Sequence, residues 1–285
     1  MPELSNYNTL RSVLERNGFN LKKSLGQNFL IDPTVCPQMA DEACADADAI
    51  IEIGPGAGVL TCELAKRAKK VVAIEIDRKL MPVLNETLAE FNNTEVIFDD
   101  VMKIDLKKLI DEKFSGMKVA VCANLPYYIT SPIIMMLLEK QLEIESITVM
   151  VQKEAAERLC AEMGTRQCGA VTAAVRYYCC PQLLFEVPRT SFMPPPNVDS
   201  AVIKLDITNN EQFSDVDNAT FFRVIKAAFS MRRKTLSNCL CSGLSMNKES
   251  VYELLDNCQI DRTVRGEQLT MEQFAVIAKA VKKEK

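Results

Sequence analysis

The stretch AIIEIGPGAG at residues 49–58 decides the fold. A short run rich in isoleucine leads directly into glycines at alternate positions. Such apolar runs suit a strand that is buried on both faces of a parallel sheet. Glycine allows the backbone to turn sharply and to approach a ligand closely. The stretch therefore predicts a buried strand, a tight loop and the start of a helix, at the sheet edge where ligands bind.

Similar segments follow along the chain. Short runs rich in Val and Ile predict strands at residues 49–53, 70–76, 95–98, 118–123 and 146–151. Helices are expected between them, at residues 59–68, 79–91, 106–113 and 132–140. Two later strand-like runs, 182–187 and 201–206, are typical of an antiparallel edge. The alternation of strands and helices predicts a doubly wound α/β sheet.

The pattern changes after a polar stretch at residues 208–212, which is typical of a linker. From Asp217 onward the apolar residues recur at helical spacing, and Thr270-x-x-Gln273 is a capping box that opens a final helix. We therefore expect two domains: residues 1–210 form the α/β domain, and residues 211–285 form a small all-α domain of about four helices.

Composition excludes several classes of protein. The 285 residues include no histidine, so Ser-His-Asp and Cys-His catalysis and histidine-based zinc sites are impossible. The eleven cysteines form no C-x-x-C pair and indicate reduced core residues. Residues 1–11 lack the apolar core of a signal peptide, and no apolar run approaches the length of a membrane span. We expect a cytoplasmic protein with no bound metal and no membrane segment.

The glycine spacing indicates the kind of cofactor. Glu75 ends the second predicted strand, where a carboxylate can accept hydrogen bonds from both hydroxyls of a ribose. The loop reads G-x-G-x-G, and Val59 stands where a dinucleotide fingerprint has its third glycine. The loop has no Arg or Lys to hold a phosphate. This pattern favours S-adenosylmethionine over a nicotinamide dinucleotide, although a purely structural glycine turn stays open.

The fourth predicted strand runs into Asn124-Leu125-Pro126-Tyr127, a motif that suits chemistry on an adenine amine. The lone pair of that amine is delocalised into the ring, so its nitrogen is a poor nucleophile. An amide oxygen and a backbone carbonyl can accept both of its N–H bonds and direct the lone pair at a methyl sulfonium. Proline fixes the backbone, and an aromatic ring can stack on an extruded base.

In these motifs the chain resembles the ribosomal RNA adenine N6,N6-dimethyltransferases, the dimethyladenosine transferase family, in its small-subunit branch. The resemblance covers nearly the whole chain. Its motifs are KSLGQNFL at 23–30, EIGPGAG at 52–58, VAIEID at 72–77, NLPY at 124–127, QKE at 152–154, FMPPPNVDSAV at 192–202 and FSMRRKTL at 229–236. It implies a Rossmann-like class I methyltransferase sheet.

The resemblance also implies roles for individual residues. The cofactor would contact Asn28, Leu30, Gly54, Gly56, Glu75, Ile76, Asp100 and Asn124. Asn124 would also serve the target, Leu125 would present its carbonyl, and Pro126 would fix it. Tyr127 and Phe192 would sandwich the target adenine. We interpret Asp99 as a helix N-cap or part of a solvated acidic turn, and Tyr128 as a core residue.

The charge pattern limits how RNA is bound. With a net charge of −4 and a pI near 5.3, the chain is no general nucleic-acid binder, so binding must come from local clusters. The resemblance selects Arg232, Arg233 and Lys234, with Lys23 and Lys153 as further candidates. For a lysine cluster alone, a solvated face is the simpler interpretation.

The resemblance implies an enzyme that dimethylates N6 of two adjacent adenosines in the loop of the 3′-terminal hairpin of 16S rRNA during small-subunit ribosome biogenesis. Its partner would be small-subunit rRNA or a 30S pre-ribosomal particle, and we expect a monomer. One alternative is the related 23S rRNA methyltransferase of the macrolide-resistance type, which usually has isoleucine in place of Leu125. Another is a non-catalytic rRNA-binding assembly factor on the same fold.

Overall fold

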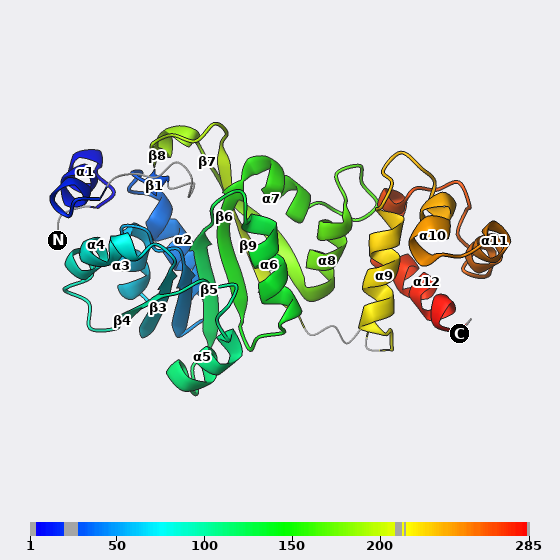
Figure 1. Cartoon of the computed structure of the whole chain (residues 1–285), viewed down its shortest axis with the longest axis horizontal. Helices are drawn as coiled ribbons and strands as arrows, with labels where there is room; N and C mark the ends of the chain where they lie inside the picture. The colour runs from blue at the N-terminus through cyan, green and yellow to red at the C-terminus, as the bar shows by residue number, and fades with distance from the viewer. Residues whose placement is uncertain (1–3, 20–27, 209–212, 214, 284–285) are drawn as a thin grey trace. The chain divides into compact units, whose positions relative to one another are not determined.

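A seven-stranded sheet organises the first part of the chain (Figure 1). The computed structural model describes residues 4–19, 28–208, 213 and 215–283. In spatial order the strands are β4 (Thr94–Phe98), β3 (Lys70–Glu75), β2 (Ala49–Ile53), β5 (Val119–Asn124), β6 (Ser146–Gln152), β9 (Ser200–Ile207) and β7 (Cys179–Val187). β2 to β6 pair in parallel, whereas β9 runs antiparallel to β6. The fold prediction is confirmed, including the edge formed by the two late strands.

The strand order places helices on both faces of the sheet. From β2 the chain moves outward through β3 to β4, and then returns to β5 and continues to β6. Crossovers between parallel strands are right-handed, so the two directions of travel put their helices on opposite faces. One face carries α3 (Val59–Ala65) and α4 (Met81–Thr87), and the other carries α5 (Leu106–Lys113) and α6 (Thr130–Glu139) (Figure 1).

Further elements complete the described chain. The first part also contains α1 (Tyr7–Arg16), β1 (Phe29–Leu30), α2 (Val35–Cys44), η2 (Arg78–Leu80), η3 (Arg189–Ser191) and β8 (Phe192–Met193). Next to it in sequence are α7 (Lys153–Leu159) and α8 (Ala170–Tyr178). The last part contains α9 (Asn218–Ala228), α10 (Leu236–Leu244), α11 (Lys248–Asn257), η5 (Gly266–Gln268) and α12 (Met271–Lys283). None of the helices described is long and apolar enough to cross a membrane.

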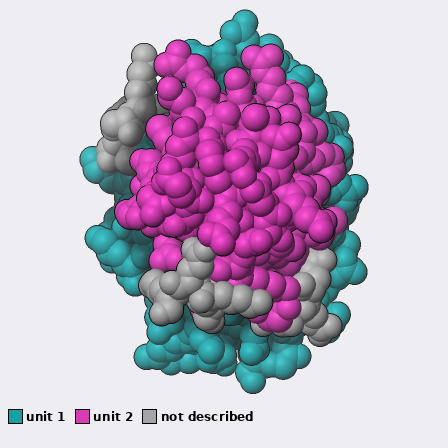
Figure 2. Space-filling view, turned by 90° about the vertical axis from the view of Figure 1, so that its right-hand side faces the viewer, with its two compact units in different colours: residues 1–156, 181–207 teal, residues 157–180, 208–285 magenta. Residues whose placement is uncertain are grey.

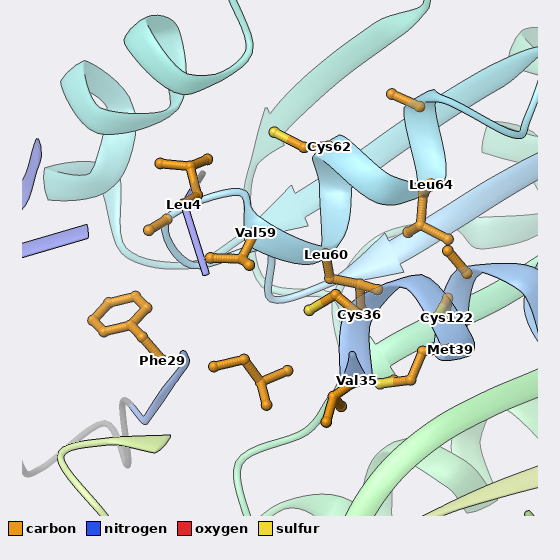
Figure 3. Close-up of a cluster of buried hydrophobic side chains, with 14 of the residues drawn as sticks. Leu4, Phe29, Val35, Cys36, Met39, Val59, Leu60, Cys62, Leu64 and Cys122 are labelled. Carbon is orange, nitrogen blue, oxygen red and sulfur yellow. The ribbon is translucent and has the colours of Figure 1, made fainter. Parts of the chain in front are cut away.

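The core beneath α2 and α3 explains why β2 is apolar at every position except Glu52. Every residue of β2 is buried, as expected for a central parallel strand. Figure 3 shows Met39 and Cys36 of α2 beside Leu60 of α3, with Cys122 of β5 nearby. All eleven cysteines are free and six are buried, in accord with reduced core residues, although Cys180 is exposed.

The chain forms two compact units, coloured separately in Figure 2. The first comprises residues 1–156 and 181–207, and the second comprises residues 157–180 and 208–285. The second unit thus takes in α8 as well as the C-terminal helices. A functional boundary at residue 210 stays a prediction, and the predicted linker residues 209–212 lie outside the described part.

The second unit has its own core. Tyr177 of α8 packs its ring against Phe213, Phe221 and Phe222. Its hydroxyl donates to Asn218 at the start of α9. Helices α9 and α10 approach closely at Gly243, where an added Cβ would lie 2.4 Å from the Cβ of Ala227. Four α-helices follow residue 217 in the described chain, as the sequence predicts.

The predicted capping box also forms. The Thr270 N–H donates to Gln273 Oε1 (3.0 Å), and the Gln273 N–H donates to Thr270 Oγ1 (3.3 Å). These reciprocal bonds satisfy two of the free N–H groups at the start of α12.

Candidate active site

The site lies where the sheet changes direction. β2 and β5 are neighbours, and the connections after them leave toward opposite edges, which is the point where open α/β sheets bind ligands. A cavity opens there. Every residue predicted for catalysis or cofactor binding lines it: Asn28, Leu30, Gly54, Gly56, Glu75, Ile76, Asp100, Asn124, Leu125, Pro126, Tyr127 and Phe192. Their roles remain predictions, but one cavity brings all of them together.

The glycine loop after β2 is bonded to the end of β3. The Gly56 N–H donates to Glu75 Oε2 (3.1 Å), and the Asp77 N–H donates to Glu75 Oε1 (2.8 Å). Gly54 has a φ of +72°, which favours glycine, and a Cβ added there would meet nothing within 4 Å. The loop therefore offers bare backbone to a ligand. Burial raises the pKa of the Glu75 carboxyl, although the two backbone bonds oppose that shift.

The lining suits a nucleoside cofactor that carries no phosphate. None of the described residues that line the cavity is Lys or Arg. Next to the Glu75 carboxylate, Ile76 is 62% exposed and offers an apolar surface to a base. These features fit S-adenosylmethionine, which has a ribose, an adenine and positive charge but no phosphate.

The acidic turn after β4 is internally bonded. Asp100 Oδ1 accepts from the Met102 N–H (3.0 Å), and Asp100 Oδ2 lies 3.7 Å from Lys103 Nζ. Asp99 is exposed and accepts from the Asp100 N–H (2.7 Å). Of the two interpretations of Asp99, the exposed turn fits and the helix N-cap does not, because α5 begins only at Leu106 with Asp105 as its N-cap. Asp99 also lines the cavity.

The motif at the end of β5 forms a rigid turn at the cavity wall. Asn124 Nδ2 makes a long contact of 3.5 Å with the Asn28 carbonyl. The Leu125 N–H donates to the Met150 carbonyl (3.3 Å), which holds the motif on β6. The Tyr127 and Ser200 hydroxyls share a hydrogen bond (2.7 Å), and burial raises the pKa of the Tyr127 phenol.

A two-stranded ladder joins the N-terminal motif to the loop that carries Phe192. In β1·β8, Leu30 lies opposite Phe192 and Phe29 lies opposite Met193. Beyond the ladder, the Ile31 N–H donates to the Ser191 carbonyl (2.9 Å). The predicted cofactor-closing residue Leu30 and the predicted base-stacking residue Phe192 therefore belong to one small piece of structure.

Asp32 and Phe29 support this ladder. The pair Asp32-Pro33 predicts a helix N-cap followed by the first helical residue, but this prediction is wrong, because α2 begins at Val35 and its N-cap is Thr34. The Ser191 hydroxyl donates to Asp32 Oδ2 (2.9 Å). The Phe29 ring packs so close to the glycine loop that a Cβ on Gly56 would lie 3.1 Å from it. Phe29 could have been noticed, because it lies within the KSLGQNFL motif, whereas nothing local to Asp32 and Ser191 predicts their bond.

A buried carboxyl in the cavity wall was also missed. Glu52 of β2 is 1% exposed, and its Oε2 has no hydrogen-bond partner among the described residues. Burial raises the pKa of Glu52 to about 8, and the nearby negative charge of Glu75 adds to the shift. The carboxyl is therefore mainly protonated at neutral pH.

The interpretation of Tyr128 as a core residue is wrong. Its side chain is 65% exposed and lines the cavity. Tyr128 lies in the turn between Pro126 and Ile129. In this turn the Tyr127 side chain is partly buried, whereas the Tyr128 side chain is exposed. Helix α6, whose apolar face is buried, begins only at Thr130, two residues later.

The predicted RNA-binding residues lie on several elements. Arg232, Arg233 and Lys234 are exposed on the turn between α9 and α10, which the Lys234 N–H closes by donating to the Met231 carbonyl (2.9 Å). Lys153 Nζ pairs with Glu186 (2.7 Å). Lys23 lies outside the described residues. The described chain holds no group of three or more His, Cys, Asp and Glu side chains that could bind a metal ion.

A family model for ribosomal RNA adenine dimethylases matches residues 18–283. The chain belongs to this family. A relative from Alkaliphilus oremlandii named ribosomal RNA small subunit methyltransferase A is 46% identical over 280 residues, 98% of each chain. Its namesake from Geobacillus sp. is 48% identical over 276 residues, 95% of each chain.

Two solved structures extend the comparison. A dimethyladenosine transferase from Plasmodium falciparum superposes with a TM-score of 0.74 at 26% identity, covering 90% of this chain and 98% of the other. The 23S rRNA methyltransferase ErmE superposes with a TM-score of 0.68 at 25% identity, covering 90% and 100%. The predictions of family, fold class, enzyme class and S-adenosylmethionine as cofactor are confirmed. This dimethylase therefore modifies adenine in ribosomal RNA.

Proposed function

We propose that this dimethylase transfers methyl groups from S-adenosylmethionine to N6 of two adjacent adenosines in the loop of the 3′-terminal hairpin of small-subunit rRNA. It would act in the cytoplasm, as a monomer, on a 30S pre-ribosomal particle. The observation that carries the proposal is the single cavity that collects the predicted cofactor and target residues. The names of relatives at 44–48% identity support the choice of subunit.

The chain's own groups supply a place for the cofactor. Glu75 would accept from the ribose, Ile76 would pack on the adenine, and Asp100 would accept from the adenine amine. The open backbone at Gly54 and Gly56 would lie along the ligand. When bound, S-adenosylmethionine supplies a methyl group on a positively charged sulfur.

The target amine needs orientation more than it needs a base. The Asn124 side-chain oxygen and the Leu125 carbonyl would accept its two N–H bonds, which raises the electron density available on nitrogen. Tyr127 and Phe192 would hold the ring between them, with Tyr127 fixed by Ser200. The raised pKa of the Tyr127 phenol keeps it neutral, so this ring acts by stacking.

The transfer balances without a histidine. The target nitrogen forms the new N–C bond as the C–S bond breaks, and the bonding electrons return to sulfur. The amine then carries an extra proton, which it loses to water. Repeating the step once on each adenosine completes two dimethyladenosines and consumes four methyl groups.

RNA would be held by a few cations. Exposed Arg232, Arg233 and Lys234 form no ion pair with any of the described residues and are available to phosphates. Lys153 would bind RNA only if its ion pair with Glu186 breaks. Lys23 is a further candidate for RNA binding. Each phosphate contact made by a cation adds to the salt dependence of binding.

Incubation with labelled S-adenosylmethionine and 30S particles lacking the modification tests the function. We expect label on N6 of two adjacent adenosines near the 3′ end of 16S rRNA. Unlabelled small-subunit rRNA would refute the proposal, and label in 23S rRNA would select the macrolide-resistance type of activity. Parallel reactions with isolated 16S rRNA would show whether the particle is required.

A further inference from the structure

Two exposed side chains at the cavity are unusual for this chain. Ile76 and Tyr128 are 62% and 65% exposed, the highest values among the large hydrophobic residues of the described chain. Single exposed apolar residues are common on protein surfaces and need no explanation. Here, however, both extremes line one cavity. The predicted adenine of the cofactor accounts for Ile76 but not for Tyr128.

The backbone holds Tyr128 firmly in its exposed position. The Pro126 carbonyl accepts from the Ile129 N–H (3.1 Å) and from the Thr130 hydroxyl (3.2 Å). The preceding residue, Tyr127, is tied to Ser200. A ring on a fixed turn loses little conformational freedom when a ligand packs on it, so it is a favourable binding surface.

The topology places Tyr128 on the target side of the cavity. Glu75 and Ile76 follow β3, whereas Tyr128 follows β5, and β2 lies between these strands. Two strand spacings amount to about 10 Å. Tyr128 instead shares its turn with Tyr127, the residue assigned to the target adenine.

The charge of the cavity lining favours a base over a phosphate. The acidic residues Glu52, Glu75, Asp99 and Asp100 line the cavity, and none of the described lining residues is Lys or Arg. A phosphate would be repelled by the ionised members of this set. The face of a nucleobase is uncharged, and it can stack on an aromatic ring whichever of the four bases it belongs to.

We propose that the Tyr128 ring is a stacking platform for the nucleotide next to the adenosine in the cavity. This inference rests on the proposed function, because that substrate has two adjacent adenosines. While one adenosine occupies the cavity, its neighbour lies on Tyr128, and the two exchange places before the second is modified. Tyr128 is therefore a binding residue for the waiting base.

Substitutions separate this role from a structural one. Y128A should raise the KM for unmodified 30S particles roughly tenfold, the loss typical of a missing stacking partner. Y128F, which keeps the ring, should restore most of that loss, whereas Y128L, which keeps only apolar bulk, should not. The affinity for S-adenosylmethionine, measured by calorimetry without RNA, should be the same in all variants. Y7A removes an exposed ring outside the cavity and serves as the control.

Thirty-S particles in which one of the two adjacent adenosines is replaced by uridine test directly whether the neighbouring base is the partner of the Tyr128 ring. Uridine stacks less strongly, so wild-type enzyme should methylate the remaining adenosine with a KM raised roughly threefold. Y128A should be insensitive to the replacement, because the partner of the base is already gone. If Y128A and wild type respond equally, or if Y128A weakens cofactor binding, the inference is overturned. Wild-type activity on particles with both adenosines reports on the proposed function separately.

Discussion

The buried carboxyl of Glu52 should make the stability of the first unit depend on pH. In the folded protein burial raises the pKa of Glu52 to about 8, whereas its ordinary value is 4.5. Between these values the folded state keeps a proton that the unfolded state has released. The contribution of Glu52 to stability is therefore fully present below pH 4.5 and is lost as the pH rises toward 8.

The size of the effect follows from the shift. Each pKa unit corresponds to about 1.36 kcal/mol, so the full shift from 4.5 to about 8 amounts to at most about 5 kcal/mol. Glu52 is 1% exposed, so solvent hardly screens its charge. Between pH 5.5 and pH 7.5 this group alone should lower the free energy of unfolding by about 2–3 kcal/mol.

Urea denaturation of wild type and E52Q at pH 5.5, 6.5 and 7.5 measures how the free energy of unfolding depends on pH. E52Q carries no proton to release at this position, so its free energy of unfolding should fall less steeply with rising pH, by roughly 1 kcal/mol per pH unit. The quantity to compare is the difference between the wild-type and E52Q slopes of the free energy of unfolding against pH. The raised pKa of Glu75 contributes to both slopes in the same direction.

E63Q provides a matched control. The pKa of Glu63 is lowered, with Lys66 and Arg67 stabilising its charged form, so its stabilising contribution is lost only in more acidic solution. E63Q should shift the whole curve and keep the wild-type slope. Parallel curves for wild type and E52Q would refute the reasoning and would mean that Glu52 is ionised in the folded protein.

Three further predictions concern the site and the second unit. Asn124→Ala should abolish methyl transfer while retaining a cooperative thermal transition within a few degrees of wild type; activity above a tenth of wild type would contradict its role. Arg232→Ala with Arg233→Ala should weaken rRNA binding and reduce the slope of log affinity against log salt by about 2, without changing cofactor affinity, as filter binding and calorimetry would show. Gly243→Ala should destabilise the second unit by about 1–3 kcal/mol, because its Cβ would lie 2.4 Å from Ala227 and force α9 and α10 apart. An unchanged urea midpoint would contradict that packing.

Local pattern was enough to predict the central strands. The run at residues 49–53 is β2 to the residue, because a strand buried on both faces needs a largely apolar run, here interrupted only by Glu52, and glycine ends it. Helix ends were less predictable. The helix expected at 79–91 is a 3-10 turn at Arg78–Leu80 followed by α4, which ends at Thr87 although apolar residues continue.

Contacts between distant segments could not be predicted from local pattern. No property of Asp32 or Ser191 predicts that they meet, since their bond follows from the pairing of β1 with β8. The state of Glu52 depends on its burial in the folded sheet and on the charge of Glu75 in the neighbouring strand β3. Tyr128 differs from Tyr127 by one position, and only the geometry of the turn decides which ring faces outward.

The β1·β8 ladder limits how early the enzyme can finish folding while it is being synthesised. Its partners Leu30 and Phe192 are roughly 160 residues apart, which corresponds to roughly 8–30 s of synthesis. For much of that time β1 is outside the exit tunnel of the ribosome, while its partner strand β8 has not yet been synthesised. The nascent chain can form β2, β3 and β4 in sequence, but it cannot close the wall of its active site until nearly the whole first unit has been translated. A newly made methylase can therefore complete its active site only after residues 192 and 193 have been synthesised and β8 has paired with β1.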